Sequence, residues 1–267
     1  MIQEGFTFYR PHEALMEYVR FYWVFRSGLT MSALTFPTGC PQIIFHRRKP
    51  LYIPELDTFQ SRLTISGQVN FPSHLSATGE TEMIVVVFKP YGLGPLLNIP
   101  ASLFYNQEVS GDGIDSLGLR ELDERISGCE DDLNCIELID NWLLSRLSKQ
   151  ANNQTQRIQA VVRRMLTAPE ATVTDLSAIA CLGKKQFERL FRLLVGVNPK
   201  EYSSIVRFQK ALAMMQSGES VLSQVAYASG YSDQSHFIRE FRRFSGQTPA
   251  TLLKTTSIHS DLFSNPV

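Results

Sequence analysis

The sequence lacks a long hydrophobic run. Its longest uninterrupted apolar segment, residues 83–88, is far shorter than the ~20 residues that a membrane-spanning helix needs. The first five residues also lack the basic region and apolar stretch of a secretion signal. We therefore expect a cytoplasmic protein with no membrane partner.

Cysteine is scarce and scattered. The four cysteines, Cys40, Cys129, Cys135 and Cys181, form no C-x-x-C pair. This spacing favours reduced structural thiols over disulfides or a zinc site.

Net charge is also missing, since 26 Lys+Arg balance 26 Asp+Glu. Taken as a total, this gives no reason to expect a polyanionic partner. The distribution is uneven, however: residues 1–150 carry 12 basic and 18 acidic side chains, a net −6, and residues 151–256 carry 14 and 7, a net +7. A basic second part beside an acidic first part indicates that the second part contacts nucleic acid.

The first hundred residues contain short segments rich in Val, Ile and Phe, separated by Pro and Gly. They predict strands at residues 19–25, 42–46, 63–69 and 83–89. Several strands without long helices between them indicate an antiparallel barrel or sandwich. Residues 11–18 are also compatible with a short helix.

From about residue 117 the pattern becomes helical. Apolar residues at three- and four-residue spacing predict a helix over residues 133–149: Ile136, Ile139, Leu143 and Leu147. The polar residues 150–154 that follow indicate a linker. We expect an N-terminal domain over residues 1–150, a second domain over 151–256 and a tail over 257–267.

The second half contains an internal repeat. Residues 187–199 match residues 237–249 at six of 13 positions, all displaced by fifty residues: Phe187, Arg189, Phe191, Arg192, Gly196 and Pro199. This pattern indicates a duplicated supersecondary unit.

Each copy reads as a short helix, a turn and a second helix. The first copy predicts helices over 174–180 and 184–195, and the second over 221–229 and 233–245. A third helix, over 199–216, joins them. Its 18 residues make a rod of about 27 Å, not far short of the ~34 Å turn of B-DNA. Two helix-turn-helix units on such a rod could enter successive major grooves.

Spacing also separates core from surface in the second helix of each copy. The predicted core positions are Phe187, Leu190, Phe191, Leu194, Phe237, Phe241 and Phe244. The predicted DNA contacts are Lys184, Lys185, Gln186, Glu188, Arg189, Arg192, Gln234, Ser235, His236, Arg239, Arg242 and Arg243. Such polar side chains can bind base edges or phosphates. The alternative is an ordinary solvated helix face, above all for Glu188, which repels phosphate.

Residues 154–253 resemble the AraC/XylS family of bacterial transcription regulators, whose DNA-binding domain has two helix-turn-helix units joined by a helix. The second unit, residues 225–243 followed by 246–249, carries most of the likeness. In the first turn, Cys181 and Gly183 stand where the family usually has Gly and Ser. The resemblance implies base contacts by Lys185, Glu188, Arg189, Gln234, Ser235 and Arg239.

Residues 18–23, 36–45 and 87–92 resemble, more weakly, the cupin-like sensor domains attached to such regulators. The resemblance implies an α+β chain whose N-terminal β-barrel binds a small effector, forms a dimer, or does both. The helix over 133–149 is the candidate dimer element. The implied function is a sequence-specific regulator that binds double-stranded DNA, and RNA polymerase if it activates.

The main rival is a small-molecule-binding or metal-dependent cupin-type protein whose basic domain binds DNA non-specifically or contacts another protein. Such metal sites need two or three His and a carboxylate at one ion. The first half has only His12, His46 and His74, widely separated and without an H-x-H pair. We therefore expect no metal, no cofactor and no catalytic residues, although Ser/His/Asp partners need not be neighbours in sequence.

Overall fold

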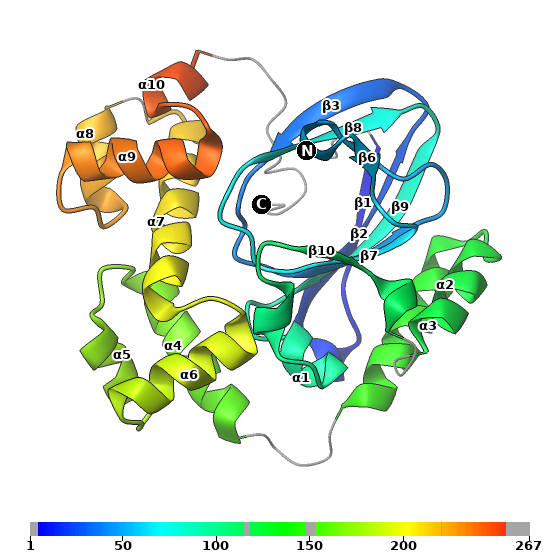
Figure 1. Ribbon diagram of the computed structural model, residues 1–267, viewed down its shortest axis with the longest axis horizontal. Helices are drawn as coiled ribbons and strands as arrows, with labels where there is room; N and C mark the ends of the chain where they lie inside the picture. Colours follow the sequence, from blue (N-terminus) through cyan, green and yellow to red (C-terminus); the bar gives the residue numbers. More distant parts are fainter. Residues whose placement is uncertain (1–4, 115–117, 148–152, 220, 255–267) are drawn as a thin grey trace.

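The computed structural model describes residues 5–114, 118–147, 153–219 and 221–254 (Figure 1). The N-terminal half holds ten strands: β1 Phe6–Tyr9, β2 Val19–Ser27, β3 Thr30–Thr35, β4 Gln42–His46, β5 Tyr52–Ile53, β6 Thr58–Phe59, β7 Leu63–Ser66, β8 Ser73–Thr78, β9 Thr81–Phe88 and β10 Glu108–Ser110. The four strands expected from the sequence are all present.

The strands pair into two antiparallel sheets. One has six strands in the order β1-β2-β9-β4-β7-β10, and the other has four in the order β3-β8-β5-β6. The arrangement is cupin-like, as expected. The hydrogen-bonded ladders of the described strands do not, however, close into one continuous barrel.

The larger sheet is apolar on both faces. Along β9, Ile84, Val86 and Phe88 pack in a core beneath helices, whereas Met83 and Val85 pack on the opposite side, toward the smaller sheet. Because successive residues of a strand point to opposite faces, a strand covered on both sides reads as a continuous apolar run. This explains the run over residues 83–88.

Three helices cover the outer face of the larger sheet: α1 Leu93–Leu97, α2 Leu119–Ser127 and α3 Asp132–Arg146. The described residues also form four short 3-10 helices, three between strands at Glu13–Leu15, Pro54–Leu56 and Ala101–Phe104 and one after β10 at Gly111–Gly113. The first of them is the short helix considered for residues 11–18. Helix α3 begins one residue before the predicted start, with the Asp131 side chain accepting a hydrogen bond from the Asn134 amide at 2.9 Å, and it ends at Arg146, earlier than predicted.

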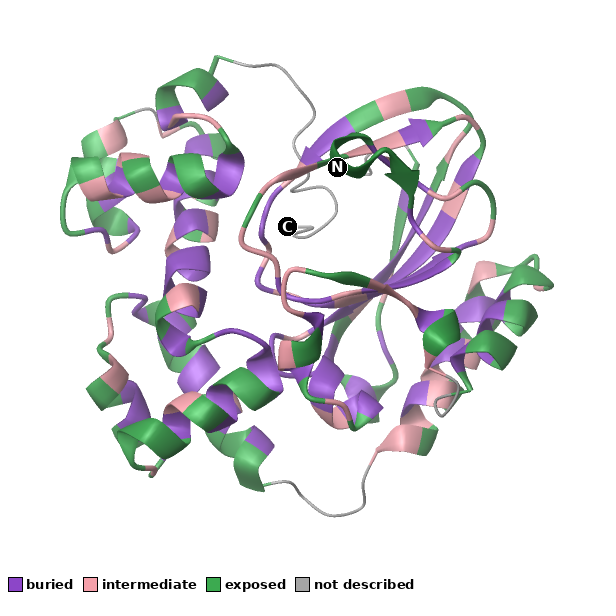
Figure 2. Cartoon of the chain, in the orientation of Figure 1, coloured by how far each residue is buried: buried purple, intermediate pink, exposed green. Residues whose placement is uncertain are grey.

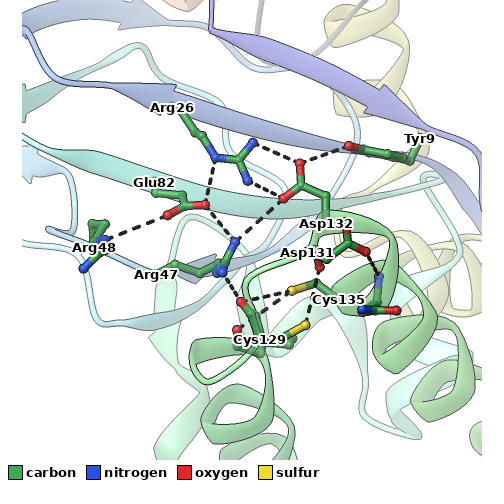
Figure 3. Close-up of polar contacts among 11 residues, drawn as sticks. Tyr9, Arg26, Arg47, Arg48, Glu82, Cys129, Asp131, Asp132 and Cys135 are labelled. Atoms are coloured by element: carbon green, nitrogen blue, oxygen red, sulfur yellow. Dashed lines mark hydrogen bonds and ion pairs between the residues drawn. The ribbon is translucent and has the colours of Figure 1, made fainter.

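A charged cluster attaches the start of α3 to the sheet (Figure 3). The Asp132 carboxylate is bonded to Arg26 and accepts from the Tyr9 hydroxyl at 3.0 Å. Glu82 in turn pairs with Arg26 at 2.9 Å and with Arg47 at 2.7 Å. The start of the helix is thereby held by a cluster of side chains from β1, β2, β9 and the segment that follows β4.

The C-terminal half is helical: α4 Asn153–Thr167, α5 Val173–Ile179, α6 Lys184–Val195, α7 Pro199–Gln216, α8 Leu222–Ala228, α9 Gln234–Ser245 and α10 Pro249–Leu252. The predicted helices over 184–195 and 199–216 are found to the residue. The expected linker is partly wrong, because Asn153 and Gln154 already belong to α4. Residues 150–152 of that linker, the boundary at 150 and the tail over 257–267 lie outside the described residues.

The C-terminal half contains two separate cores rich in aromatic residues, and α7 contributes to both. Tyr202 and Val206 of α7 pack with α4, α5 and α6, whereas Phe208 and Leu212 pack with α8 and α9. Buried residues consequently run along the length of α7 (Figure 2). No helix in the described parts of the chain is long and apolar enough to cross a membrane.

The two halves contact each other along α7. Phe36 of the N-terminal half meets Phe208 edge to face, with ring centroids 5.8 Å apart. Nearby, the Gln209 side chain donates to the Pro37 carbonyl at 2.6 Å. Since Leu34 and Phe36 belong to the same buried cluster as α7 and α9, the second helix-turn-helix unit rests partly on the N-terminal half.

Candidate nucleic-acid interface

Helix α6 has one buried and one exposed face. Phe187, Leu190, Phe191 and Leu194 are buried, as predicted. The predicted DNA contacts Lys184, Lys185, Gln186, Arg189 and Arg192 are exposed, and Glu188 is half-buried. The four basic side chains among them form no ion pair with any described residue. The helix therefore presents uncompensated positive charge to solvent.

Helix α9 repeats this division. Phe237, Phe241 and Phe244 are fully buried, and Gln234, Ser235, Arg239, Arg242 and Arg243 are exposed. His236 differs from the rest: it is half-buried, its Nδ1 lies 3.2 Å from the Ser232 hydroxyl, and its Nε2 lies 3.6 Å from Glu240. His236 thus packs within the unit as much as it faces outward.

The two turns use the same backbone device with different residues. After α5, Cys181 adopts a positive φ of 51°, and after α8, Gly230 adopts a φ of 86°. In both turns, the amide of the residue after the positive-φ residue donates a hydrogen bond back to a helix carbonyl: Leu182 to Ser177 at 3.1 Å and Tyr231 to Ala226 at 3.0 Å. This left-handed C-terminal turn favours glycine, so Cys181 does occupy the position of the usual glycine.

The second turn is one residue longer, and the helix starts differ as a result. Asp233 caps α9 by accepting from the His236 amide at 2.7 Å, and this bond is the main cause of the lowered pKa of Asp233. Gly183 precedes α6 and supplies no side-chain cap. The first-turn amides of α6 thereby remain available to an anion, which the positive end of a helix favours.

A partly buried ion pair that sequence reasoning missed fixes α9 on α7. Arg207 of α7 pairs with Glu240 of α9 at 3.0 Å, and the Ser204 hydroxyl donates to the same carboxylate at 2.6 Å. The Arg207 guanidinium also lies over the Tyr231 ring, 5.3 Å from its centroid. These contacts set the angle of α9 relative to α7 and hence to α6.

A second contact that the sequence did not reveal joins Arg243 to the N-terminal half. Glu201, in the first turn of α7, accepts from Arg243 at 3.2 Å and also from Asn70 at 2.7 Å and Tyr105 at 2.6 Å. Burial, together with the Glu201 carboxylate, raises the pKa of Tyr105 to about 12. One predicted phosphate contact, Arg243, therefore already has a carboxylate partner.

The N-terminal half contains a cavity of about 460 Å³ between its two sheets. Its wall includes Gln60 and Glu108, which are linked to the buried His46. Burial lowers the pKa of His46 to about 4. His12, His46 and His74 do not converge, and no group of three or more His, Cys, Asp or Glu in the described residues could hold a metal ion.

Two family profiles match the chain. A helix-turn-helix domain family matches residues 176–255, and a domain family of unknown function (DUF6597) matches residues 7–110. The probable transcriptional regulator LumQ of Photobacterium leiognathi is 37% identical over 78 residues, covering 29% of this chain and 32% of LumQ.

The uncharacterized HTH-type transcriptional regulator YidL of Escherichia coli K12 is 24% identical over 176 residues, covering 61% of this chain and 58% of YidL. Both alignments span less than two thirds of the relative. Among solved structures, ToxT of Vibrio cholerae O395 aligns with 99% of this chain and 100% of its own, at 12% identity and a TM-score of 0.45. Residues 176–255 are an AraC-type helix-turn-helix domain.

Proposed function

We propose that the chain is a sequence-specific DNA-binding transcription regulator that inserts α6 and α9 into successive major grooves. The observation that carries this proposal is the duplicated unit, in which two amphipathic helices turn basic faces outward from one shared helix, α7. As a regulator of bacterial genes, it would act in the cytoplasm, where the DNA lies. The proposal includes no catalytic step.

The predicted contacts divide into two groups. The positions that match the base contacts of similar regulators are proposed to bind base edges: Lys185, Glu188, Arg189, Gln234, Ser235 and Arg239. Lys184, Gln186, His236 and the later arginines Arg192, Arg242 and Arg243 suit phosphates, which position the protein without reading sequence. Arg243 would have to leave Glu201 to do so.

Selection of bound sequences from a random pool of duplex DNA tests the proposal. We expect enrichment of two half-sites about one helical turn apart. If 6–8 phosphates are neutralised, the logarithm of the association constant should fall against the logarithm of salt concentration with a slope of about −5 to −7. A pool without enrichment, or affinity that salt leaves unchanged, would contradict the proposal.

Arginine substitutions distinguish base-specific contacts from phosphate contacts. Arg189→Ala or Arg239→Ala should cost about 1–3 kcal/mol of binding free energy and relax the preference at one base position. Arg192→Ala is the matched control on the same exposed face of α6, and it should weaken all sequences alike. If Arg189→Ala and Arg239→Ala left sequence preference intact, these residues would not be base readers.

The N-terminal domain is proposed to control this binding. It is acidic, and it touches the DNA-binding half at Glu201 and along α7. Control by a small effector is the main hypothesis. Homodimerisation through α3 and contact with RNA polymerase, if the protein activates, are further predictions. The apolar stripe of α3 is packed into its own domain, so a dimer would have to use the outer face of that helix.

A further inference from the structure

The cavity in the N-terminal half has the size of a small-molecule site. Its 460 Å³ falls within the ~300–1,000 Å³ that such sites usually enclose. Apolar side chains from both sheets make up much of its wall, among them Trp23, Ile44, Leu75 and Met83. A ligand with an apolar body would be held between the two sheets.

The charged side chains on the wall are acidic. Among the described residues that line the cavity, Glu55 and Glu108 are ionisable carboxylates, and no lysine or arginine is present. Glu55 already has a partner, since His74 lies 2.7 Å away and both side chains are about half exposed. Glu108 has no cationic partner among the described residues.

A chain of hydrogen bonds fixes the Glu108 carboxylate. The neutral His46 ring meets the Gln60 carbonyl oxygen at 3.0 Å, so the Gln60 amide turns its NH₂ group to both Glu108 oxygens, each at 2.9 Å. Glu108 remains accessible from the cavity, and yet the loss of hydration around it raises the pKa of its carboxyl group. The site therefore holds an oriented carboxylate that lacks a counter-ion.

Gln68 supplies a second acceptor on the same wall. Its side chain is 2% exposed, its Nε2 donates to the Gly39 carbonyl at 2.9 Å, and its Oε1 has no hydrogen-bond partner among the described residues. Glu108 lies directly opposite Ser66 in the sheet, and Gln68 follows Ser66 by two residues. Glu108 and Gln68 both line the same cavity. A buried acceptor without a donor is unfavourable. Because this oxygen is itself buried, a ligand in the cavity can donate to it only after the Gln68 side chain turns toward the cavity.

We propose that this cavity binds an organic cation: an amine with an aromatic or branched apolar body, whose ammonium group donates to Glu108 and, once the Gln68 side chain turns toward it, to Gln68 Oε1. An ammonium group carries up to three N–H donors and the one charge that the carboxylate lacks. An acid of the same shape would bring a second negative charge to Glu108 and no donor for Gln68. The structure thus favours amines over carboxylic acids.

The cavity wall is also the surface on which α7 rests. Gly39 lines the cavity, and a side-chain carbon added to it would lie 3.3 Å from the Tyr202 ring of α7. Phe36 lines it too and meets Phe208. A ligand that shifts residues 36–40 must therefore shift or strain their contacts with α7. The consequence for DNA binding rests on the function proposed above.

Three probes with one apolar body and different head groups test the ligand class by calorimetry on the full chain: 4-phenylbutylamine, 4-phenylbutan-1-ol and 4-phenylbutyrate. We expect the amine to bind at least tenfold more tightly than the alcohol, and the acid to bind weakest. Glu108→Gln should reduce amine affinity to that of the alcohol and leave alcohol affinity unchanged, which also shows that the variant folds.

Two further variants serve as controls. Glu55→Gln removes the acid already paired with His74 and should change amine affinity less than twofold. Ser66→Phe fills the cavity beside Glu108 and should abolish binding of both the amine and the alcohol. The proposal is overturned if the acid binds tightest, if none of the three probes binds, or if Glu108→Gln leaves amine affinity unchanged.

Operator binding measured with and without 4-phenylbutylamine separates this inference from the proposed function. We expect the amine to change operator affinity at least threefold in the parent chain and not in Glu108→Gln. Specific DNA binding without amine binding would overturn the ligand assignment alone. Amine binding without any DNA sequence preference would overturn the proposed regulator and leave the cavity assignment standing.

Discussion

Acid should destabilise the N-terminal half through His46, a side chain with no catalytic or DNA-binding assignment. The His46 ring is 1% exposed, its Nε2 is hydrogen-bonded to Gln60, and no residue in the described parts of the chain is hydrogen-bonded to its Nδ1. Protonation would place a charged N–H in the interior without an acceptor. For this reason burial lowers the pKa of His46 from 6.5 to about 4.

The magnitude follows from the two pKa values. Because the folded-state value lies below the unfolded one, the unfolded chain takes up the proton first, and stability falls as the pH decreases from about 6.5 to about 4. Each pH unit in this window costs about 1.4 kcal/mol. Between pH 7 and pH 5, His46 should therefore remove about 2 kcal/mol of unfolding free energy.

Urea unfolding followed by tryptophan fluorescence measures this loss, since both tryptophans, Trp23 and Trp142, lie in the N-terminal half. The parent chain should lose about 2 kcal/mol more than His46→Gln between pH 7 and pH 5. Glu108 acts in the opposite direction, because its raised pKa makes acid stabilising, but it is present in both proteins. Equal losses in the parent and the variant would refute the assignment of a buried neutral histidine.

Two further predictions concern the helix-turn-helix units. Phe241→Ala should cost about 3–5 kcal/mol of stability, because its fully buried ring packs 5.1 Å from Phe208 and 5.5 Å from Phe237; thermal unfolding without DNA measures this, and a loss near that of the exposed control Arg242→Ala would contradict the packing. Cys181→Gly should add about 0.5–1 kcal/mol, since its φ of 51° favours glycine. Gly230→Ala should lower stability, because its φ is 86° and the added carbon would lie 3.2 Å from Pro169. Unchanged unfolding temperatures in both variants would contradict a left-handed residue in the two turns.

Local signals made parts of the helical half predictable. Helix α7 begins with proline after an Asn198 cap and ends just before Ser217 and Gly218, and α6 ends at a glycine with a φ of 98°. These residues act within a turn of the helix end, so the sequence alone locates it. The exposed face of α6 and α9 follows from the same short-range spacing.

Other features depend on residues far apart in the chain. Strand β8 is half serine and threonine by composition and has little strand signal; its six-residue pairing with β3 determines it. Glu201 meets Asn70 and Tyr105 across more than 90 positions. The cavity likewise joins Gln68, Glu108 and Trp23, which no spacing rule relates. Strand pairing and contacts between the two halves determine these features. Such long-range interactions produce no recognisable pattern in the local sequence.

The sharing of α7 between two cores has a consequence for how such a chain can change. An α-helix turns by about 100° and advances 1.5 Å with each residue. A single insertion within Pro199–Gln216 would therefore swing one unit around the DNA relative to the other, even if both cores stayed intact. Insertions in the loops around the units can be tolerated during evolution. The length of α7 cannot change in this way, because it fixes both the separation and the relative rotation of the two units.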